Sequence, residues 1–280
     1  MGGYVADWRP APVNSSDVIS ARRAAELAAT LDLDEAFADG DTLPPLWQWA
    51  YFLDWPPTGE LGPDGHPLHG HFLPPIPYRR RMFAGGRMTV TAPLVVGEPA
   101  ARRSALAAAR VKTGRTGELL FVTVRHDYRQ GDQLRLVEEQ DLVYRSDSGT
   151  STPYARVTEP LEPPSAPWVV QPRPGPALLF RFSALTGNAH RIHYDQAYTT
   201  GVEGYPGVVV HGPLLAVYMA ELARAQAAGR RLRDFEFRLS RPVFVGDEFR
   251  VQGRPTTDGT ELAVVSGGGA VHASATARYA

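Results

Sequence analysis

Apolar and polar residues alternate along several segments of the chain, and this period of two is typical of strands that bury one face. A short apolar run that ends in a polar turn, residues 177–182, is also predicted to be a strand. The predicted strands are residues 88–91, 93–98, 101–111, 119–128, 132–144, 177–182 and 274–279.

Three other segments predict helices. Residues 19–33 place Leu27 and Leu31 on one helical face. Residues 46–53 are apolar nearly all round, as in a short buried helix, and are a candidate for the core helix of a first domain. The third helix is expected to start at Pro213, because a proline costs no hydrogen bond in the first helical turn.

One sequence pattern occurs twice. Residues 92–98, APLVVGE, return as RPVFVGD at residues 241–247, and strands that end on Tyr128 and Tyr279 keep nearly the same spacing. Two such matches predict two related domains, each with an antiparallel sheet wrapped around a helix, an α+β arrangement. The predicted parts are an N-terminal domain (1–146), a linker rich in Ser, Pro and Thr (147–176) and a C-terminal domain (177–280).

Composition narrows the class of protein. A chain of 280 residues with 43% hydrophobic residues has enough apolar side chains for a packed core. Its formal net charge of −1 gives no electrostatic reason to expect nucleic acid or an anionic membrane as a partner. Cysteine is absent, which excludes disulfides and thiolate chemistry, and neither a signal peptide nor a membrane span is recognisable, so we expect a cytoplasmic protein.

The densest set of reactive side chains lies between residues 181 and 215. His190 and His193 follow a polar turn, and His211 with Gly212 comes directly before the third predicted helix. Histidine transfers protons near neutral pH, and free N–H groups at a helix start stabilise negative charge. The segment therefore predicts an acid–base site beside an anion-stabilising backbone.

These motifs carry a family resemblance. The segment TGNAHRIH (186–193), followed by VHG (210–212), resembles the active-site region of MaoC-like hydratases, hot-dog enzymes that add water to acyl thioesters or remove it. Asn188 stands where that family has its catalytic aspartate, and His190 with Arg191 stands in place of its Asn-Pro pair. The variant resembles a narrower branch, the type 2 hydroxyacyl-thioester dehydratases and the mesaconyl-CoA (itaconyl-CoA) hydratases.

The resemblance implies a double hot-dog fold in which the C-terminal domain is catalytic and the N-terminal domain shapes the pocket. His193 would be the principal acid–base residue, Asn188 would hold water, and the backbone N–H of Gly212 would stabilise the enolate oxygen. His190 would be either a second proton carrier or an orienting group.

Substrate contacts are also implied. Arg80 and Arg81 lie in a three-arginine segment suited to CoA phosphates, and Arg191 is a candidate for a substrate carboxylate or a phosphate. His211 is expected to support the helix entrance at the substrate site. The histidines of residues 59–77 lie among glycines and prolines, and we interpret that segment as a structural loop.

The predicted reaction is therefore the hydration or dehydration of an acyl-CoA or of an acyl carrier protein thioester. No cofactor or metal is expected, and the chain is a candidate homodimer. Two alternatives remain at this point: a non-catalytic acyl-thioester binding protein, favoured by Asn188, and a hot-dog thioesterase.

Overall fold

A computed structural model describes residues 2–77, 79–114, 117–146 and 154–280. Its α-helices are α1 (Gly2–Val5), α2 (Ala21–Thr30), α3 (Pro176–Leu185), α4 (Gln196–Gly201) and α5 (Gly212–Ala225). Its 3-10 turns are η1 (Trp47–Ala50), η2 (Thr58–Glu60), η3 (Arg191–His193) and η4 (Gly267–Gly269). Its strands are β1 (Val13–Val18), β2 (Arg79–Val90), β3 (Pro99–Gly114), β4 (Gly117–Gln130), β5 (Gln133–Ser146), β6 (Trp168–Val170), β7 (Leu232–Leu239), β8 (Phe249–Pro255), β9 (Thr260–Ser266) and β10 (Val271–Tyr279).

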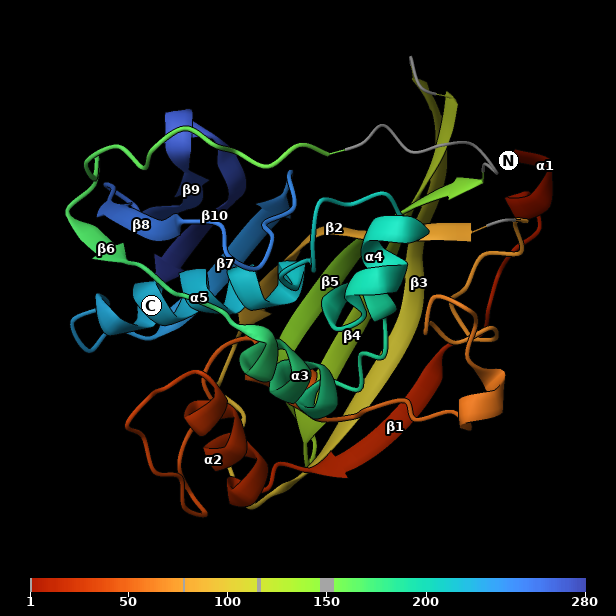
Figure 1. Cartoon of the computed structure of the whole chain (residues 1–280). Coiled ribbons are helices and arrows are strands. Elements are labelled where there is room, and N and C mark those ends of the chain that lie inside the picture. Colours follow the sequence, from red (N-terminus) through yellow and green to blue (C-terminus); the bar gives the residue numbers. More distant parts are fainter. Residues whose placement is uncertain (1, 78, 115–116, 147–153) are drawn as a thin grey trace.

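All ten of these strands join one antiparallel sheet, in the order β1-β3-β4-β5-β2-β7-β10-β9-β8-β6 (Figure 1). The first five strands of the chain form one side of this sheet and the last five form the other. They meet where β2 pairs with β7, from Gly85 opposite Arg238 to Thr89 opposite Asp234. The predicted α+β class is confirmed, but the two expected sheets are one continuous sheet.

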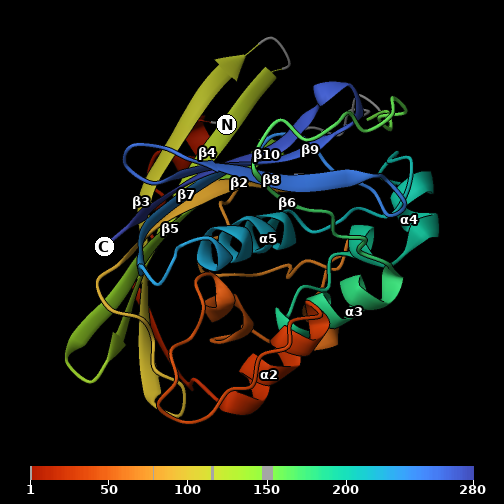
Figure 2. The same ribbon diagram turned by 90° about the vertical axis from the view of Figure 1, so that its left-hand side faces the viewer.

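The helices lie on the concave side of the sheet, where α5 packs against β7 to β10 (Figure 2). Eight residues of α5 are buried, among them Leu215 and Met219, so the helix is apolar nearly all round. The same core cluster includes Trp47 and Met88 from the N-terminal half. One apolar core therefore spans both halves of the chain.

The two copies of the repeated pattern make the same turn. The Leu43 N–H donates to the Leu94 carbonyl over 2.8 Å, and the Val210 N–H donates to the Val243 carbonyl over 2.8 Å. In the C-terminal half, α5 follows this contact directly. In the N-terminal half, η1 stands in the corresponding place.

The helix predicted at 46–53 is therefore wrong, because the structure has only the four-residue turn η1 there. Leu46 and Phe52 adopt left-handed conformations, with φ of 70° and 55°, on either side of the turn. Such residues do not continue a right-handed helix. The concave face of β2 to β5 consequently has no counterpart of α5 among the described residues.

Two predicted strands are also wrong. Residues 177–182 form most of α3, because Gly175 and Pro176 begin a helix and the buried Leu179 and Phe182 are three residues apart. Residues 93–98 form a turn whose single strand-like contact is a bridge between Val95 and Thr42.

The remaining sequence-based elements are confirmed at slightly different bounds. They are the strands at 88–91, 101–111, 119–128, 132–144 and 274–279 and the helices at 19–33 and from Pro213. Part of the predicted linker, residues 147–153, lies outside the described residues, as does Tyr78 of the three-arginine segment. The described part of that linker contains β6, which pairs with β8. No helix in the described ranges is long and apolar enough to cross a membrane.

Candidate active site

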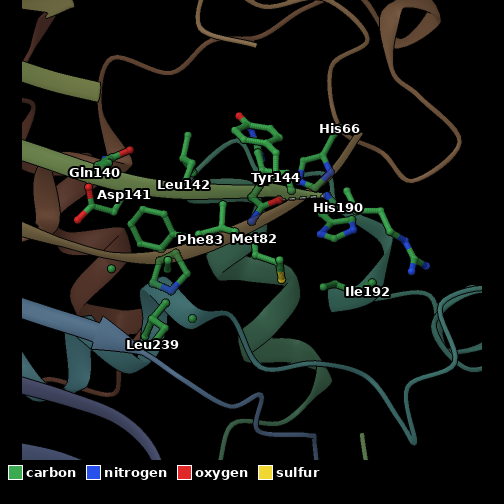
Figure 3. A pocket seen from close by; sticks show the side chains of 18 of the residues that line it. His66, Met82, Phe83, Gln140, Asp141, Leu142, Tyr144, His190, Ile192 and Leu239 are labelled. Atoms are coloured by element: carbon green, nitrogen blue, oxygen red, sulfur yellow. Dashed lines mark hydrogen bonds between the residues drawn. The ribbon is translucent and has the colours of Figure 1, made fainter. Parts of the chain in front are cut away.

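A cavity of about 1880 Å³ lies between the halves, on the side where the N-terminal half has no long helix. Strands β2 and β5 form one wall, with Phe83, Leu142 and Tyr144, and Leu239 of β7 approaches from the other half (Figure 3). The reactive end of the cavity is lined by Asp64, His66, Asn188, His190, His193 and Gly212. Sequence motifs from both halves therefore meet in one space.

His193 is held at the end of η3 as a neutral base. Its Nδ1 lies 2.8 Å from the Val209 carbonyl oxygen, and because a carbonyl only accepts, Nδ1 carries the hydrogen. The unprotonated Nε2 has no hydrogen-bond partner among the described residues. Burial lowers the pKa of His193 to about 4, although the bond to Val209 acts in the opposite direction.

The ring of His211 packs against the ring of His193. The two imidazoles are stacked with centroids 3.7 Å apart, and Nε2 of His211 lies 2.8 Å from the Ser183 hydroxyl. His211 is fully buried, and burial holds its pKa well below the usual value. It does not itself line the cavity, so its contact with the site is through His193.

Gly212 begins α5 beside these rings. Its N–H is one of the first-turn donors that have no partner inside the helix. A Cβ at this position would lie 2.5 Å from Cδ1 of Leu239, so glycine lets β7 approach the helix start. An oxygen bound here would face both a free N–H and the positive end of the helix dipole.

Asn188 stabilises the turn that carries the histidines. Its Oδ1 accepts the backbone N–H of His190 over 3.1 Å, and the preceding Gly187 has φ of 61°. His190 is half-buried, and its ring lies 5.6 Å from that of His193. Burial, with the neighbouring histidines, lowers the pKa of His190 to about 2.

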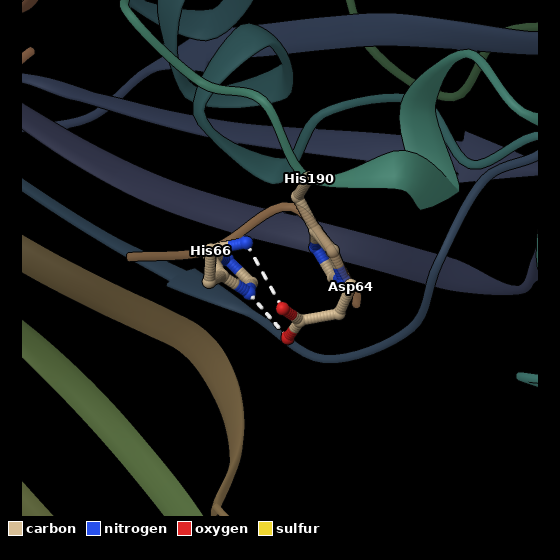
Figure 4. A group of neighbouring side chains, drawn as sticks. All are labelled: Asp64, His66 and His190. Atoms are coloured by element: carbon tan, nitrogen blue, oxygen red, sulfur yellow. Dashed lines mark hydrogen bonds and ion pairs between the residues drawn. The ribbon is translucent and has the colours of Figure 1, made fainter. Parts of the chain in front are cut away.

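The sequence interpretation missed the other side of this cluster. Residues 59–77 lack long regular elements, as predicted, yet they bring Asp64 and His66 against His190 (Figure 4). The rings of His66 and His190 are 4.0 Å apart, and Asp64 Oδ2 lies 2.9 Å from His66 Nδ1. An aspartate two residues before a histidine was the available signal, but sequence did not reveal that the loop folds onto residues 189–191.

Contacts with the backbone hold this loop in place. The Arg191 N–H donates to the Asp64 carbonyl over 2.8 Å, and the Arg191 guanidinium donates to the Pro63 carbonyl over 2.8 Å. Gly65 has φ of +86°, and a Cβ there would lie 1.9 Å from the Ala189 carbonyl oxygen. The loop is therefore packed tightly against the segment that carries His190.

The predicted substrate arginines differ in their surroundings. Arg191 is paired with Asp195 at 2.7 Å, lies over the ring of Tyr198 and is absent from the cavity lining. Arg80 lines the cavity but is paired with Glu203 at 3.1 Å. These interactions occupy the two guanidinium groups.

Arg81 also lines the cavity, and no described carboxylate lies within 4.0 Å of it. It lies near the buried Tyr144 hydroxyl, for which the described residues offer no other hydrogen-bond partner. Of these three arginines, Arg81 is the one whose charge is available at the cavity.

Asp64, His66 and His190 are also close enough to share a metal ion, since their ligand atoms lie within 4.8 Å of one another. The hydrogen bond between Asp64 and His66 already joins two of the three groups. Burial alone would raise the pKa of Asp64, but the bonds from His66 outweigh it and bring that pKa to about 2. We interpret the cluster as an ionised carboxylate that orients a neutral imidazole.

The fold and the cavity define a hot-dog enzyme of acyl-thioester chemistry. The sequence model of a family described as hydroxyacyl-thioester dehydratase type 2 matches residues 46–245, and the chain belongs to this family. Its activity is that of a hydro-lyase, a hydratase or dehydratase.

Sequence relatives agree with this assignment. The chain is 46% identical over 263 residues to a mesaconyl-C(4)-CoA hydratase of Chloroflexus aurantiacus, covering 93% of this chain and 92% of the relative. It is 35% identical over 129 residues to the mitochondrial hydroxyacyl-thioester dehydratase type 2 of Schizosaccharomyces pombe, covering 45% of this chain and 42% of that protein.

Solved structures confirm the hot-dog fold. HtdX of Mycobacterium tuberculosis superimposes with a TM-score of 0.67 at 17% identity, covering 96% of this chain and 100% of that one. A MaoC-like dehydratase from Phytophthora capsici gives a TM-score of 0.69 at 13% identity, covering 100% of this chain and 99% of the other.

Proposed function

We propose that this enzyme reversibly hydrates a short, unsaturated dicarboxylic acyl-CoA of the mesaconyl-C4 type, with His193 at the centre of catalysis. The observation that carries the proposal is the neutral His193, whose Nδ1 is fixed by Val209 and whose Nε2, beside the start of α5, has no partner among the described residues. Identity of 46% to a mesaconyl-C(4)-CoA hydratase over most of both chains supports the substrate class and CoA as the carrier.

The residues fit the steps of such a reaction. Nε2 of His193 accepts a hydrogen bond from the water that attacks the β-carbon and so increases its nucleophilicity. The negative charge that develops on the thioester oxygen is stabilised by the Gly212 N–H, a type of contact worth roughly a hundredfold or more in rate. Asn188 and the neutral His190 fix the turn around this water.

Arg81 is our candidate for the residue that binds the free carboxylate of the acyl group. Of the three predicted arginines, it is the one without a carboxylate partner among the described residues, and the Tyr144 hydroxyl beside it offers a hydrogen bond to the same group. Arg80 also lines the cavity and remains our candidate for a CoA phosphate, which would compete with Glu203 for its guanidinium group.

We also propose that residues 1–146 and 177–280 are two hot-dog units joined by residues 147–176. The matching hydrogen bonds at Leu43 and Val210 support a common origin for the two halves. In this arrangement the first unit lacks a long helix like α5, and the acyl chain occupies the space that such a helix would fill. The predicted homodimer stays a prediction.

The function is tested by the loss of enoyl-thioester absorbance with mesaconyl-C4-CoA and with crotonyl-CoA. Wild-type protein should consume the first faster, and His193→Ala should lower kcat by at least about a hundredfold without loss of fold. His69→Ala, in the exposed part of the 59–77 loop, should behave as wild type. Near-normal turnover by His193→Ala would remove His193 from the mechanism.

Substrate choice is tested separately with Arg81→Gln. Removing this charge should lower kcat/KM for mesaconyl-C4-CoA by about a hundredfold and leave crotonyl-CoA within about threefold, since only the former has a carboxylate to pair. Arg103→Gln, an exposed change on β3, is the matched control. Equal losses with both substrates would contradict the carboxylate role.

A further inference from the structure

The active-site turn carries Asn188, an amide that cannot exchange a proton as a carboxylic acid can. A carboxylate is nevertheless present in the same cavity. It is Asp64, and it comes from the N-terminal half, so it is remote in sequence from the histidine motif.

Asp64 forms a dyad with His66. Oδ2 of Asp64 accepts from Nδ1 of His66 over 2.9 Å, while Oδ1 accepts the backbone N–H of the same residue over 2.9 Å. An ionised carboxylate only accepts, so the hydrogen is on Nδ1 and the lone pair is on Nε2. This pairing fixes the tautomer of His66 and stabilises a positive charge on its ring.

The loop that carries the dyad is attached to the turn that carries His190. Backbone and guanidinium donors of Arg191 hold the carbonyls of Pro63 and Asp64, and the absence of a Cβ at Gly65 allows contact with Ala189. The ring of His66 is consequently held 4.0 Å from that of His190 (Figure 3), which itself lies 5.6 Å from the ring of His193. A loop with no other function would not need this precision.

We propose that His66, positioned by Asp64, is a second catalytic residue, which takes over the proton transfer that an amide at position 188 cannot perform. The inference rests on the proposed hydration and deepens it. His193 and His66 would hold the attacking water between them, one from each side of His190.

The step balances with water as the only co-reactant. The oxygen of the water bonds to the β-carbon as one of its O–H bonds breaks and the proton moves to Nε2 of His66. The electron pair of the carbon–carbon double bond moves toward the thioester oxygen beside Gly212. The α-carbon then takes the proton from His66, which gives the 3-hydroxyacyl thioester and restores the neutral imidazole.

Asp64 stabilises a proton on His66 through its hydrogen bond to Nδ1, although burial lowers the pKa of His66 overall. The groups that face His66 are Asp64 on its own loop, Arg81 on β2, His190 before η3 and Glu203 after α4. Burial and Arg81 lower the pKa of His66, whereas Asp64 and Glu203 raise it. The partner of His193 Nδ1 is instead the neutral Val209 carbonyl, and no described carboxylate is hydrogen-bonded to that ring.

The experiment compares His66→Gln, Asp64→Asn and the loop control His69→Ala in kcat and KM from pH 5 to 9, with both enoyl-CoA substrates. His66→Gln should lower kcat by about a hundredfold to a thousandfold and change KM by less than about threefold. Asp64→Asn should lower kcat by about tenfold or more. It should also shift the acid limb of kcat/KM to lower pH, because the pKa of His66 falls when the carboxylate charge is removed.

The shift of the acid limb of kcat/KM in Asp64→Asn distinguishes an effect of Asp64 on the His66 imidazole from a purely structural role of Asp64 in the loop. His66→Gln with kcat within threefold of wild type, or Asp64→Asn with an unmoved acid limb, would overturn the proposal. Activity that is lost on chelation and restored by zinc would also overturn it, in favour of a metal at this cluster. A wild-type protein that hydrates neither substrate would instead contradict the proposed function, and the inference would fall with it.

Discussion

Three histidine rings pack against one another inside the protein, those of His190, His193 and His211. Burial disfavours the protonated, charged form of each ring. Burial is the largest cause for each ring, lowering the pKa of His193 to about 4 and that of His190 to about 2. A base that is neutral over the physiological range accepts hydrogen bonds from water at all such pH values. The same burial makes the fold sensitive to acid.

The direction of this sensitivity follows from linkage. In the unfolded chain His193 binds a proton near pH 6.5, whereas in the folded protein it does so only near pH 4. Its contribution to stability is therefore present above pH 6.5 and is lost as the pH falls from 6.5 toward 4. Each pKa unit corresponds to about 1.4 kcal/mol, so His193 should account for about 2 kcal/mol between pH 7 and 5.

Urea unfolding at pH 7 and pH 5 measures this contribution. His193→Gln should lose about 2 kcal/mol less than wild type over that interval, because its side chain does not titrate. His69→Gln should follow wild type, since residue 69 is exposed. Identical pH dependence in wild type and His193→Gln would show that the ring is not held neutral by the fold.

At the scale of elements, the site depends on a loop that packs against a turn. Gly65 is the closest point of that contact, and its φ of +86° already disfavours other residues. A methyl group there would meet the Ala189 carbonyl, so Gly65→Ala should push Asp64 and His66 away from His190. We expect kcat to fall by at least about tenfold with no titratable group altered.

Gly40 offers a matched control for this change. Its φ is +96°, and nothing lies within 4 Å of a Cβ built there. Gly40→Ala therefore carries a similar backbone penalty without the collision. Comparing kcat and the melting temperature of both variants separates the two effects, and equal kcat values would argue against the docked loop as part of the site.

The elements also show what sequence can and cannot predict. The alternation in β2 to β5 and β10 and the periodicity of α5 depend on local spacing, so these elements were predicted, whereas β1 and β6 to β9 were not. The motif placed His193 and Gly212 in one segment. The helix α3 was missed because a short apolar run does not distinguish strand from helix. Asp64 and His66 were missed because their role depends on Arg191 and Gly65, a contact between segments more than a hundred residues apart that leaves no local pattern.

At the scale of the whole molecule, the sequence repeat predicts two domains, whereas the shared sheet and the shared core join the two halves of the chain into one unit. The sheet continues from β2 to β7, and a single core cluster includes Trp47 of the first half and Met219 of the second. The Trp47 indole N–H donates to the half-buried Glu221 carboxylate of α5 over 2.8 Å. Neither half buries its apolar face alone, so we expect them to unfold together.

Trp47→Ala tests this coupling from the N-terminal side. Trp47 is fully buried, and truncating such a residue typically costs about 3 to 5 kcal/mol. The loss should appear as one urea transition at lower denaturant, seen alike by circular dichroism of the shared sheet and by fluorescence. Trp55→Ala should change stability by less than about 0.5 kcal/mol, since its side chain is 71% exposed.

The shape of the urea transition of Trp47→Ala decides whether the two halves are independent domains or one cooperative unit. If the halves were independent domains, the change would lower only the first of two transitions and leave α5 with β7 to β10 folded. One transition for every probe would instead mean that the cavity is formed by a single cooperative unit. The loop that carries Asp64 and His66 could then not detach from the His193 turn by separation of the halves, and only a local opening of the loop itself would move it.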